Sequence, residues 1–313
     1  MKPAKQELGN RVFSLSYLID SALATENNMV ISFLQSVFAD LSSKYVNTLL
    51  ETPDLKLFEV MQKLMGYQSK KLIKVCSFWK DYFKKVNLIK DKEARKARIL
   101  SLKELIQSLI LISLNKIQIT EETFIDLNAA SSDDELLREV KDQRYDYKKV
   151  LYSIGACIDA KDYWLLFKEK FLTCVKTIES NPSERAPWMQ LEAIFITLSA
   201  LLRGYFCINS LEVHGDDIII LKELFTLMLN MNKEVIQLQR AIIEVLWSIA
   251  KELDKIPDLL KNVLKYLFEC IMIPLIKEEA LDAVLKVMEC NQPLLVDNES
   301  FNYLLQSIIK YNQ

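Results

Sequence analysis

The chain has 313 residues, half of them apolar and 26% charged, a composition that is typical of a folded protein and excludes intrinsic disorder. Its 40 Lys and Arg nearly balance its 42 Asp and Glu, so the net charge of −2 gives no electrostatic footprint for direct nucleic-acid binding or for an anionic membrane surface. Only 5 Gly and 7 Pro are present, whereas sheet-rich folds need such residues at many tight turns. The abundance of Leu, Ile, Lys and Glu therefore predicts an all-α fold.

Targeting and membrane signals are missing from the sequence pattern. Residues 1–10 are polar and lack the apolar core of a signal peptide, and no stretch reaches the roughly 18 uninterrupted apolar residues of a membrane span. The six cysteines lie singly in apolar stretches without a CxxC pair, so we expect small buried side chains in a reducing compartment. Together these features predict a nuclear or cytosolic protein without membrane insertion.

Helical periodicity begins near residue 7 and continues almost without interruption. In the segment 69–88 the apolar residues share one helix face, namely Leu72, Val75, Cys76, Trp79, Tyr82, Phe83 and Val86. No convincing strand pattern of alternating polarity occurs anywhere in the sequence. Helices are expected near 7–25, 28–49, 54–66, 69–88, 91–117, 134–159, 161–180, 187–206, 216–230, 233–253, 257–271, 275–290 and 298–312.

Adjacent predicted helices pair as hairpins at a spacing of about 40 residues, which is the period of HEAT and armadillo repeats. The segments 161–206, 216–253 and 257–290 show the pairing best. A hairpin of this kind cannot bury its apolar face alone and must stack on its neighbours. We therefore predict one continuous HEAT-repeat α-solenoid over residues 1–313, a right-handed superhelix of about six antiparallel hairpins, with an irregular polar loop near 118–133.

Residue types that carry catalysis are nearly absent. The single histidine, His214, lies beside Gly215 in a predicted loop, and no cysteine pair or acidic cluster supports a nucleophile or a metal site there. The acidic run at 133–135 precedes an apolar stretch and is typical of a helix N-terminus. No glycine-rich phosphate-binding motif is present. We predict no catalytic residue, no cofactor and no metal, and hence no enzyme activity.

A basic run from Lys90 to Lys103 has two interpretations. It could form a patch for nucleic acid or for an acidic partner. It is interleaved with Asp91 and Glu93, however, and leads directly into the apolar run that follows it. This pattern favours an ordinary solvated helix face.

The polar sides of the second helices of the hairpins form a candidate protein-binding surface. If these helices line the inner wall of the stack, their mixed charges form a ladder suited to holding a protein. Ordinary solubility explains the same positions equally well. The predicted protein-binding residues are Glu192, Arg203, Gln237, Arg240, Glu244, Lys251, Glu278, Asp282 and Lys286.

Three motifs in a fixed order resemble a known family. They are Phe78-Trp79-Lys80-Asp81-Tyr82, the segment 147–155, and the run that opens with Pro187-Trp188-Met189-Gln190-Leu191. Their order and spacing are similar to the middle HEAT repeats of importin-β-type nuclear transport receptors, or karyopherins, and closest to the transportin-SR branch. The resemblance spans roughly residues 10–313 and covers only the central repeats of that much longer family.

Such a resemblance implies a protein that carries protein cargo through nuclear pores and shuttles between nucleus and cytoplasm. The implied partners are cargo, the GTPase Ran and Phe-Gly nucleoporins. No Ran-binding or cargo-binding residue is carried over, because no matching motif is present. The alternative function is a HEAT-repeat scaffold subunit of a stable complex that does not depend on Ran, and fold alone does not choose between the two.

Overall fold

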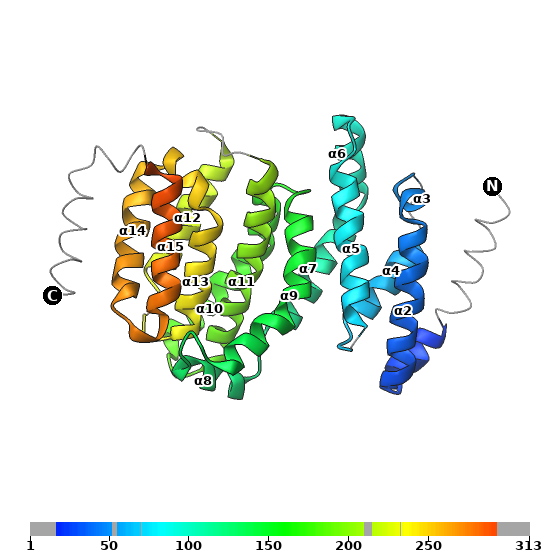
Figure 1. Cartoon of the computed structure of the whole chain (residues 1–313), viewed down its shortest axis with the longest axis horizontal. Helices are drawn as coiled ribbons and strands as arrows, with labels where there is room; N and C mark the ends of the chain where they lie inside the picture. Colours follow the sequence, from blue (N-terminus) through cyan, green and yellow to red (C-terminus); the bar gives the residue numbers. More distant parts are fainter. Residues whose placement is uncertain (1–16, 52–54, 70, 210–214, 232, 293–313) are drawn as a thin grey trace. The chain divides into compact units, whose positions relative to one another are not determined.

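The protein is described by a computed structural model that covers residues 17–51, 55–69, 71–209, 215–231 and 233–292. Within these ranges the chain consists of helices, turns and short connections, without a strand. The predicted all-α class is therefore confirmed for the described chain (Figure 1).

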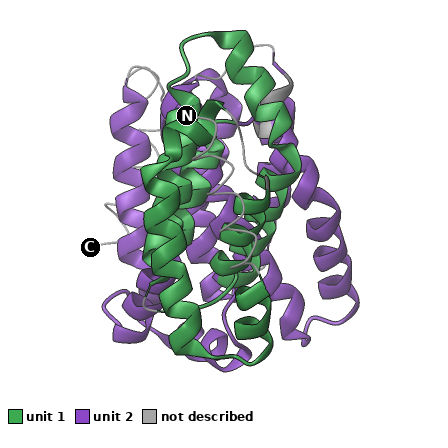
Figure 2. Cartoon of the chain, turned by 90° about the vertical axis from the view of Figure 1, so that its right-hand side faces the viewer, with its two compact units in different colours: residues 1–116, 145–157 green, residues 117–144, 158–313 purple. Residues whose placement is uncertain are grey.

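The described chain divides into two compact units, which Figure 2 draws in green and purple. Unit 1 comprises the described residues up to 116 together with Tyr145–Cys157, and unit 2 comprises Ile117–Arg144 and the described residues from 158 onward. Helix α9, Glu135–Gly155, contributes its first half to unit 2 and its second half to unit 1. The single continuous array inferred from the repeat spacing stays a prediction.

Unit 1 is built around α5. Its helices are a segment at 17–24, α2 (Asn28–Lys44), α3 (Val46–Glu51), α4 (Leu55–Met65), α5 (Leu72–Asn87), α6 (Lys92–Ser101) and α7 (Lys103–Ile117). Helix α5 packs against α2, α3, α4 and α6. Its apolar face carries Trp79 and Tyr82, whose rings contact Phe58 of α4 with centroid distances of 5.5 and 5.1 Å. The face predicted from the periodicity of 69–88 is thus the buried one.

Unit 2 arranges most of its helices in two rows. The first row is α10 (Ala160–Ser180), α12 (Asp216–Leu229) and α14 (Pro257–Ile271), and the second is α11 (Arg185–Ile208), α13 (Ile236–Ser248) and α15 (Lys277–Cys290). Within each row successive helices pack together, and α10 packs against α11 as α14 does against α15 (Figure 1). The helices of the segments 161–206 and 257–290 thus pack in pairs as predicted, whereas α12 and α13 of the segment 216–253 make little contact with each other.

Two prolines and a short 3-10 segment set the boundaries near the end of unit 2. Pro257 occupies the first turn of α14, where a missing N–H costs nothing. Pro274 begins the 3-10 helix η2 (Pro274–Ile276), which separates α14 from α15. A second 3-10 helix, η1 (Ala250–Lys255), follows α13, so the helix predicted over 233–253 is shorter than expected and changes type.

The prediction of an irregular loop near 118–133 is wrong. The segment contains helix α8, Glu121–Ala129. Thr120 caps it, because the Thr120 side chain accepts a hydrogen bond from the backbone N–H of Thr123. Phe124 and Leu127 lie one helical turn apart and are both buried, and α8 packs against α11 and α13. Three large apolar residues among many polar ones, one of them the exposed Ile125, are too weak a periodic signal to reveal so short a helix.

Helix α11 lies at the centre of unit 2. By length and composition it is the one described helix that could cross a membrane, yet 78% of its most apolar window is buried inside the protein. Neighbouring helices cover it on several sides, since it packs against α8, α10 and α13. A helix that is covered on several sides is mostly apolar because it forms part of a core.

Candidate functional site

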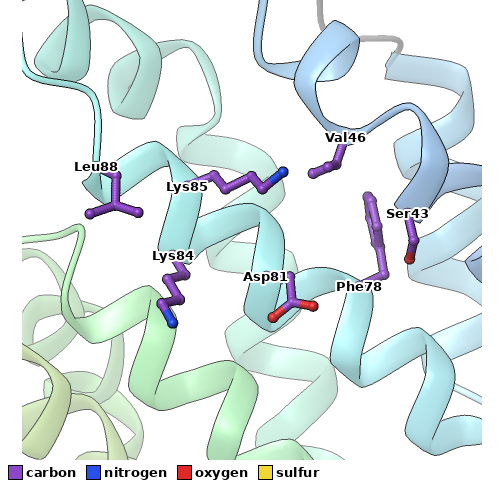
Figure 3. A pocket seen from close by; sticks show the side chains of 7 residues that line it. All are labelled: Ser43, Val46, Phe78, Asp81, Lys84, Lys85 and Leu88. Carbon is purple, nitrogen blue, oxygen red and sulfur yellow. The ribbon is translucent and has the colours of Figure 1, made fainter.

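A small open pocket lies in unit 1 where α2 and α3 meet α5. Its volume is about 320 Å³ and its lining residues are Ser43, Val46, Phe78, Asp81, Lys84, Lys85 and Leu88. Figure 3 shows that most of these side chains come from one side of α5, with Ser43 and Val46 facing them from the neighbouring helices. The lining of the pocket therefore combines apolar and charged side chains.

The sequence analysis missed this pocket because its walls come from segments about 30 or more residues apart. One local signal was present. Lys84 and Lys85 lie on α5 next to Leu88, whose surface is 68% exposed. The sequence shows only that these two lysines precede a leucine, and it does not show that the leucine is exposed.

The basic segment that follows the pocket forms α6. None of the described α6 side chains is buried, which agrees with both interpretations of the basic run, a partner-binding patch and an ordinary solvated helix face. Asp91 caps α6 through hydrogen bonds from the backbone N–H groups of Glu93 and Ala94. The Arg98 guanidinium donates to the backbone carbonyls of Leu50 and Glu51 at the end of α3, where a cation offsets the negative end of the helix dipole.

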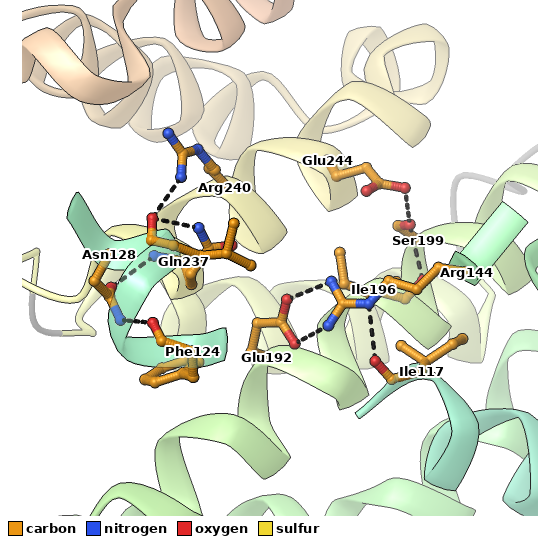
Figure 4. A network of polar contacts seen from close by, with 11 residues as sticks. Ile117, Phe124, Asn128, Arg144, Glu192, Ile196, Ser199, Gln237, Arg240 and Glu244 are labelled. Atoms are coloured by element: carbon orange, nitrogen blue, oxygen red, sulfur yellow. Dashed lines mark hydrogen bonds and ion pairs between the residues drawn. The ribbon is translucent and has the colours of Figure 1, made fainter. Parts of the chain in front are cut away.

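In unit 2, the predicted binding residue Glu192 is buried in an ion pair with Arg144. The two Arg144 terminal nitrogens donate to the two Glu192 carboxylate oxygens at 2.7 and 2.8 Å, and Arg144 Nε donates to the Ile117 carbonyl at 2.8 Å (Figure 4). Only 1% of the Glu192 surface is exposed. Glu192 is thus a buried structural residue, and its predicted place on an exposed wall is wrong.

Gln237 and Arg240 are also buried, and they hold the C-terminal end of α8 against α13 (Figure 4). Gln237 Nε2 donates to the Leu127 carbonyl at 2.7 Å, and Arg240 donates to the carbonyls of Leu127 and Ala130 at 3.0 and 2.6 Å. The Leu127 carbonyl also accepts a hydrogen bond from the N–H of Ala130, the C-cap residue of α8, at 3.2 Å. Side-chain donors of this kind supplement the end of a helix, where the last C=O groups have no partner one turn further on. The prediction of an exposed position is therefore wrong for both residues.

Arg240 keeps its positive charge in this buried place with help from a neighbouring carboxylate. Burial lowers the pKa of the Arg240 guanidinium, and the nearby Glu279 carboxylate opposes that shift. Arg240 Nε donates to Glu279 at 3.3 Å, and another guanidinium nitrogen donates to the Leu275 carbonyl at 2.8 Å. One side chain thereby connects α13 to α8, to η2 and to α15.

The remaining predicted residues lie nearer the surface. Glu244 is half-buried and accepts a hydrogen bond from the Ser199 hydroxyl at 2.8 Å (Figure 4). The exposed Arg203 guanidinium lies over the Trp247 ring at 4.8 Å from its centroid. Lys251 belongs to η1 and is exposed. On α15, Glu278 and Asp282 are exposed and Lys286 is half-buried.

The structure therefore does not gather the nine predicted residues into one surface. The helical-wheel argument assumes that each helix has one buried side and one free side. Helices α11 and α13 break that assumption because each packs on several neighbours, including α8. Their polar sides consequently carry the buried network, whereas α15 keeps a polar exposed side.

Chemically reactive groups are few in the described part of the chain. No group of three His, Cys, Asp or Glu residues in that part is arranged to hold a metal ion. His214 lies outside the described residues. Burial raises the pKa of the Cys157 thiol to about 12 and those of Cys174 and Cys270 to about 11, so these thiols stay protonated at neutral pH. Cys207 is exposed and Cys157 and Cys290 are half-buried, so the expectation that all six cysteines are buried holds only for Cys76, Cys174 and Cys270.

No known family model matches the sequence, and no curated protein matches it significantly.

Proposed function

We propose that this chain is a protein-binding HEAT-type α-solenoid and not an enzyme. The two rows of packed helices in unit 2 carry this proposal. In repeat proteins each hairpin contacts chiefly its neighbours, so that like helices line up in two layers and present extended surfaces to partners. The proposal requires no cofactor and no metal.

Within this class we propose a nuclear transport receptor of the importin-β type, or the central segment of one. The support is the ordered set of aromatic motifs that resembles that family, at Phe78-Trp79 and Pro187-Trp188. The proposed partners are protein cargo, Ran and Phe-Gly nucleoporins, and the proposed location is the nucleus and cytoplasm. Buried aromatic residues also serve general packing. A binding measurement is therefore needed to distinguish a transport receptor from another helical protein.

Direct binding tests this proposal. Purified chain would be passed over immobilised Ran, loaded either with a non-hydrolysable GTP analogue or with GDP, and over a Phe-Gly repeat peptide. A transport receptor binds the GTP form more tightly and binds the Phe-Gly peptide but not its Ser-Gly counterpart. Equal affinity for the two nucleotide forms, without Phe-Gly binding, would refute the receptor proposal.

A stable-complex scaffold is the second candidate, and exposed apolar residues on α2 favour it. Met29 and Phe33 lie one turn apart on this helix and are 83% and 66% exposed. Adjacent large apolar side chains on a surface are typical of a lasting interface. A scaffold of this kind would retain the same partner with either nucleotide form of Ran and would lose it after Phe33→Ser.

A further inference from the structure

The pocket of unit 1 carries positive charge on two lysines that have no carboxylate partner in the described part of the chain. Its one carboxylate, Asp81, lies 3.5 Å from Lys80 Nζ. Lys85 Nζ donates to the neutral side-chain oxygen of Asn47 at 2.8 Å. Lys84 is exposed and makes no ion pair with any residue in the described ranges. The rim therefore presents two ammonium groups without a carboxylate partner.

The surrounding segment extends this excess of positive charge. Residues 71–103 contain eleven Lys and Arg but three Asp and Glu. Asp91 is engaged as the N-cap of α6, and Glu93 lies 3.7 Å from Lys96. The net charge of the whole chain is thus close to zero, although the stretch on α5 and α6 is strongly basic. A partner with negative charge would complement this surface.

The apolar residues that line the pocket differ in how much surface they offer. Phe78 is 1% exposed and Val46 is 8% exposed, so both are mostly covered by their neighbours, whereas 68% of the Leu88 surface is free. Lys85 extends from α5 toward Val46 (Figure 3). A volume of about 320 Å³ is at the small end of ligand-binding cavities, and it suits one or two apolar side chains.

We propose that this pocket binds an acidic segment of a partner protein, with carboxylates on Lys84 and Lys85 and one apolar side chain packed against the exposed Leu88. The proposal rests on the proposed protein-binding class but not on Ran or nuclear transport. The lack of an exposed aromatic ring among the lining residues favours a peptide over nucleic acid. Single-stranded nucleic acid binds by stacking its bases on exposed aromatic faces, whereas the Phe78 ring is almost wholly covered.

Fluorescence anisotropy with a synthetic probe tests the proposal. The probe is a short fluorescein-labelled peptide in which glutamates flank a central Leu-Phe pair. One control peptide has Ser-Ser in place of Leu-Phe, and another has lysines in place of the glutamates. Oligo-dT of similar length serves as the nucleic-acid competitor. All measurements use the full chain at low and at physiological salt, because exposed ion pairs weaken as salt rises.

Two variants separate the charged rim from the apolar part. Lys84→Ser/Lys85→Ser removes the rim charges, and Leu88→Ser removes the exposed apolar side chain. The matched control is Lys261→Ser/Lys265→Ser, which removes two exposed lysines one turn apart on α14 in unit 2. Circular dichroism checks that each variant keeps its helices.

The expected result is saturable binding of the acidic Leu-Phe probe and weaker binding of both control peptides. Lys84→Ser/Lys85→Ser should weaken probe binding about threefold to tenfold at low salt, since each exposed ion pair contributes modestly. The α14 control should change nothing. The proposal is overturned if the Ser-Ser peptide binds equally well, if oligo-dT binds more tightly and is lost in the same variant, or if no probe binds. If the chain binds the acidic Leu-Phe probe but neither Ran nor the Phe-Gly peptide, the receptor function is rejected and the proposal for the pocket stands.

Discussion

The buried pair between Arg144 and Glu192 allows a sharp test of how unit 2 is held together. In Glu192→Ala, the Arg144 guanidinium would keep its bond to the Ile117 carbonyl but would lose both carboxylate contacts, at 2.7 and 2.8 Å. Breaking a buried pair by removing one partner costs about 3–5 kcal/mol, because the remaining charge is left without compensation. For a domain of this size such a loss lowers Tm by about 6–20 °C.

Urea unfolding followed by far-ultraviolet circular dichroism measures this loss. Glu278→Ala is the matched control, because Glu278 is an exposed glutamate of the same unit. The control should stay within about 0.5 kcal/mol of the parent protein. A loss for Glu192→Ala as small as that of the control would refute the argument that burial gives this ion pair its importance.

A double variant then separates the ion pair from general packing. In Arg144→Met/Glu192→Met both charges are replaced by apolar side chains. Such a replacement is often neutral, although here the Ile117 carbonyl loses a donor, at a cost of about 1–3 kcal/mol. The double variant should therefore be more stable than Glu192→Ala. If the loss of stability in the double variant equals the sum of the losses in Arg144→Met and Glu192→Met measured singly, the two side chains do not interact.

Three further predictions concern other parts of the fold. Arg240→Met should speed hydrogen exchange of the α8 amides at least tenfold, because the carbonyls at the end of α8 lose their cationic donor, whereas Lys251→Ala should leave exchange unchanged. Cys207 should react rapidly with a disulfide reagent at pH 8 and Cys157 should not, since burial raises the pKa of Cys157 from 9.0 to about 12. Trp79→Ala should destabilise unit 1 by about 3–5 kcal/mol in urea unfolding, because it empties the centre of an aromatic cluster.

The raised thiol pKa values also give stability a defined pH dependence. In the native state Cys157 holds its proton up to a pH of about 12, whereas the unfolded thiol loses its proton near 9.0. The contribution to stability is fully present below pH 9 and is lost as the pH rises toward 12. Replacing Cys157 by Ala should reduce this alkaline loss in urea midpoints measured between pH 8 and 11. An unchanged pH slope would contradict the assignment.

Local patterns were sufficient to predict the helical class and several helix boundaries. The spacing of apolar residues predicted the buried face of α5. When only one side of a helix is covered, its apolar residues recur with the helical period and mark that side. Pro257 and Pro274 marked the limits of α14 and α15, since proline acts on the backbone wherever it stands. The hairpins α10–α11 and α14–α15 followed from short connections between long helices.

Tertiary packing decided which polar residues are exposed to solvent. Helices α11 and α13 each contact several neighbouring helices. Glu192, Gln237 and Arg240 are therefore buried, although their spacing among the apolar residues predicts a solvent-exposed helix face. Helix α8 is short and is stabilised by packing against α11 and α13. These contacts cannot be predicted from the sequence of α8 alone. The unit 1 pocket likewise depends on which helix lies beside α5. A periodic pattern reports on one helix, whereas burial and pockets depend on contacts between residues that are distant in the chain.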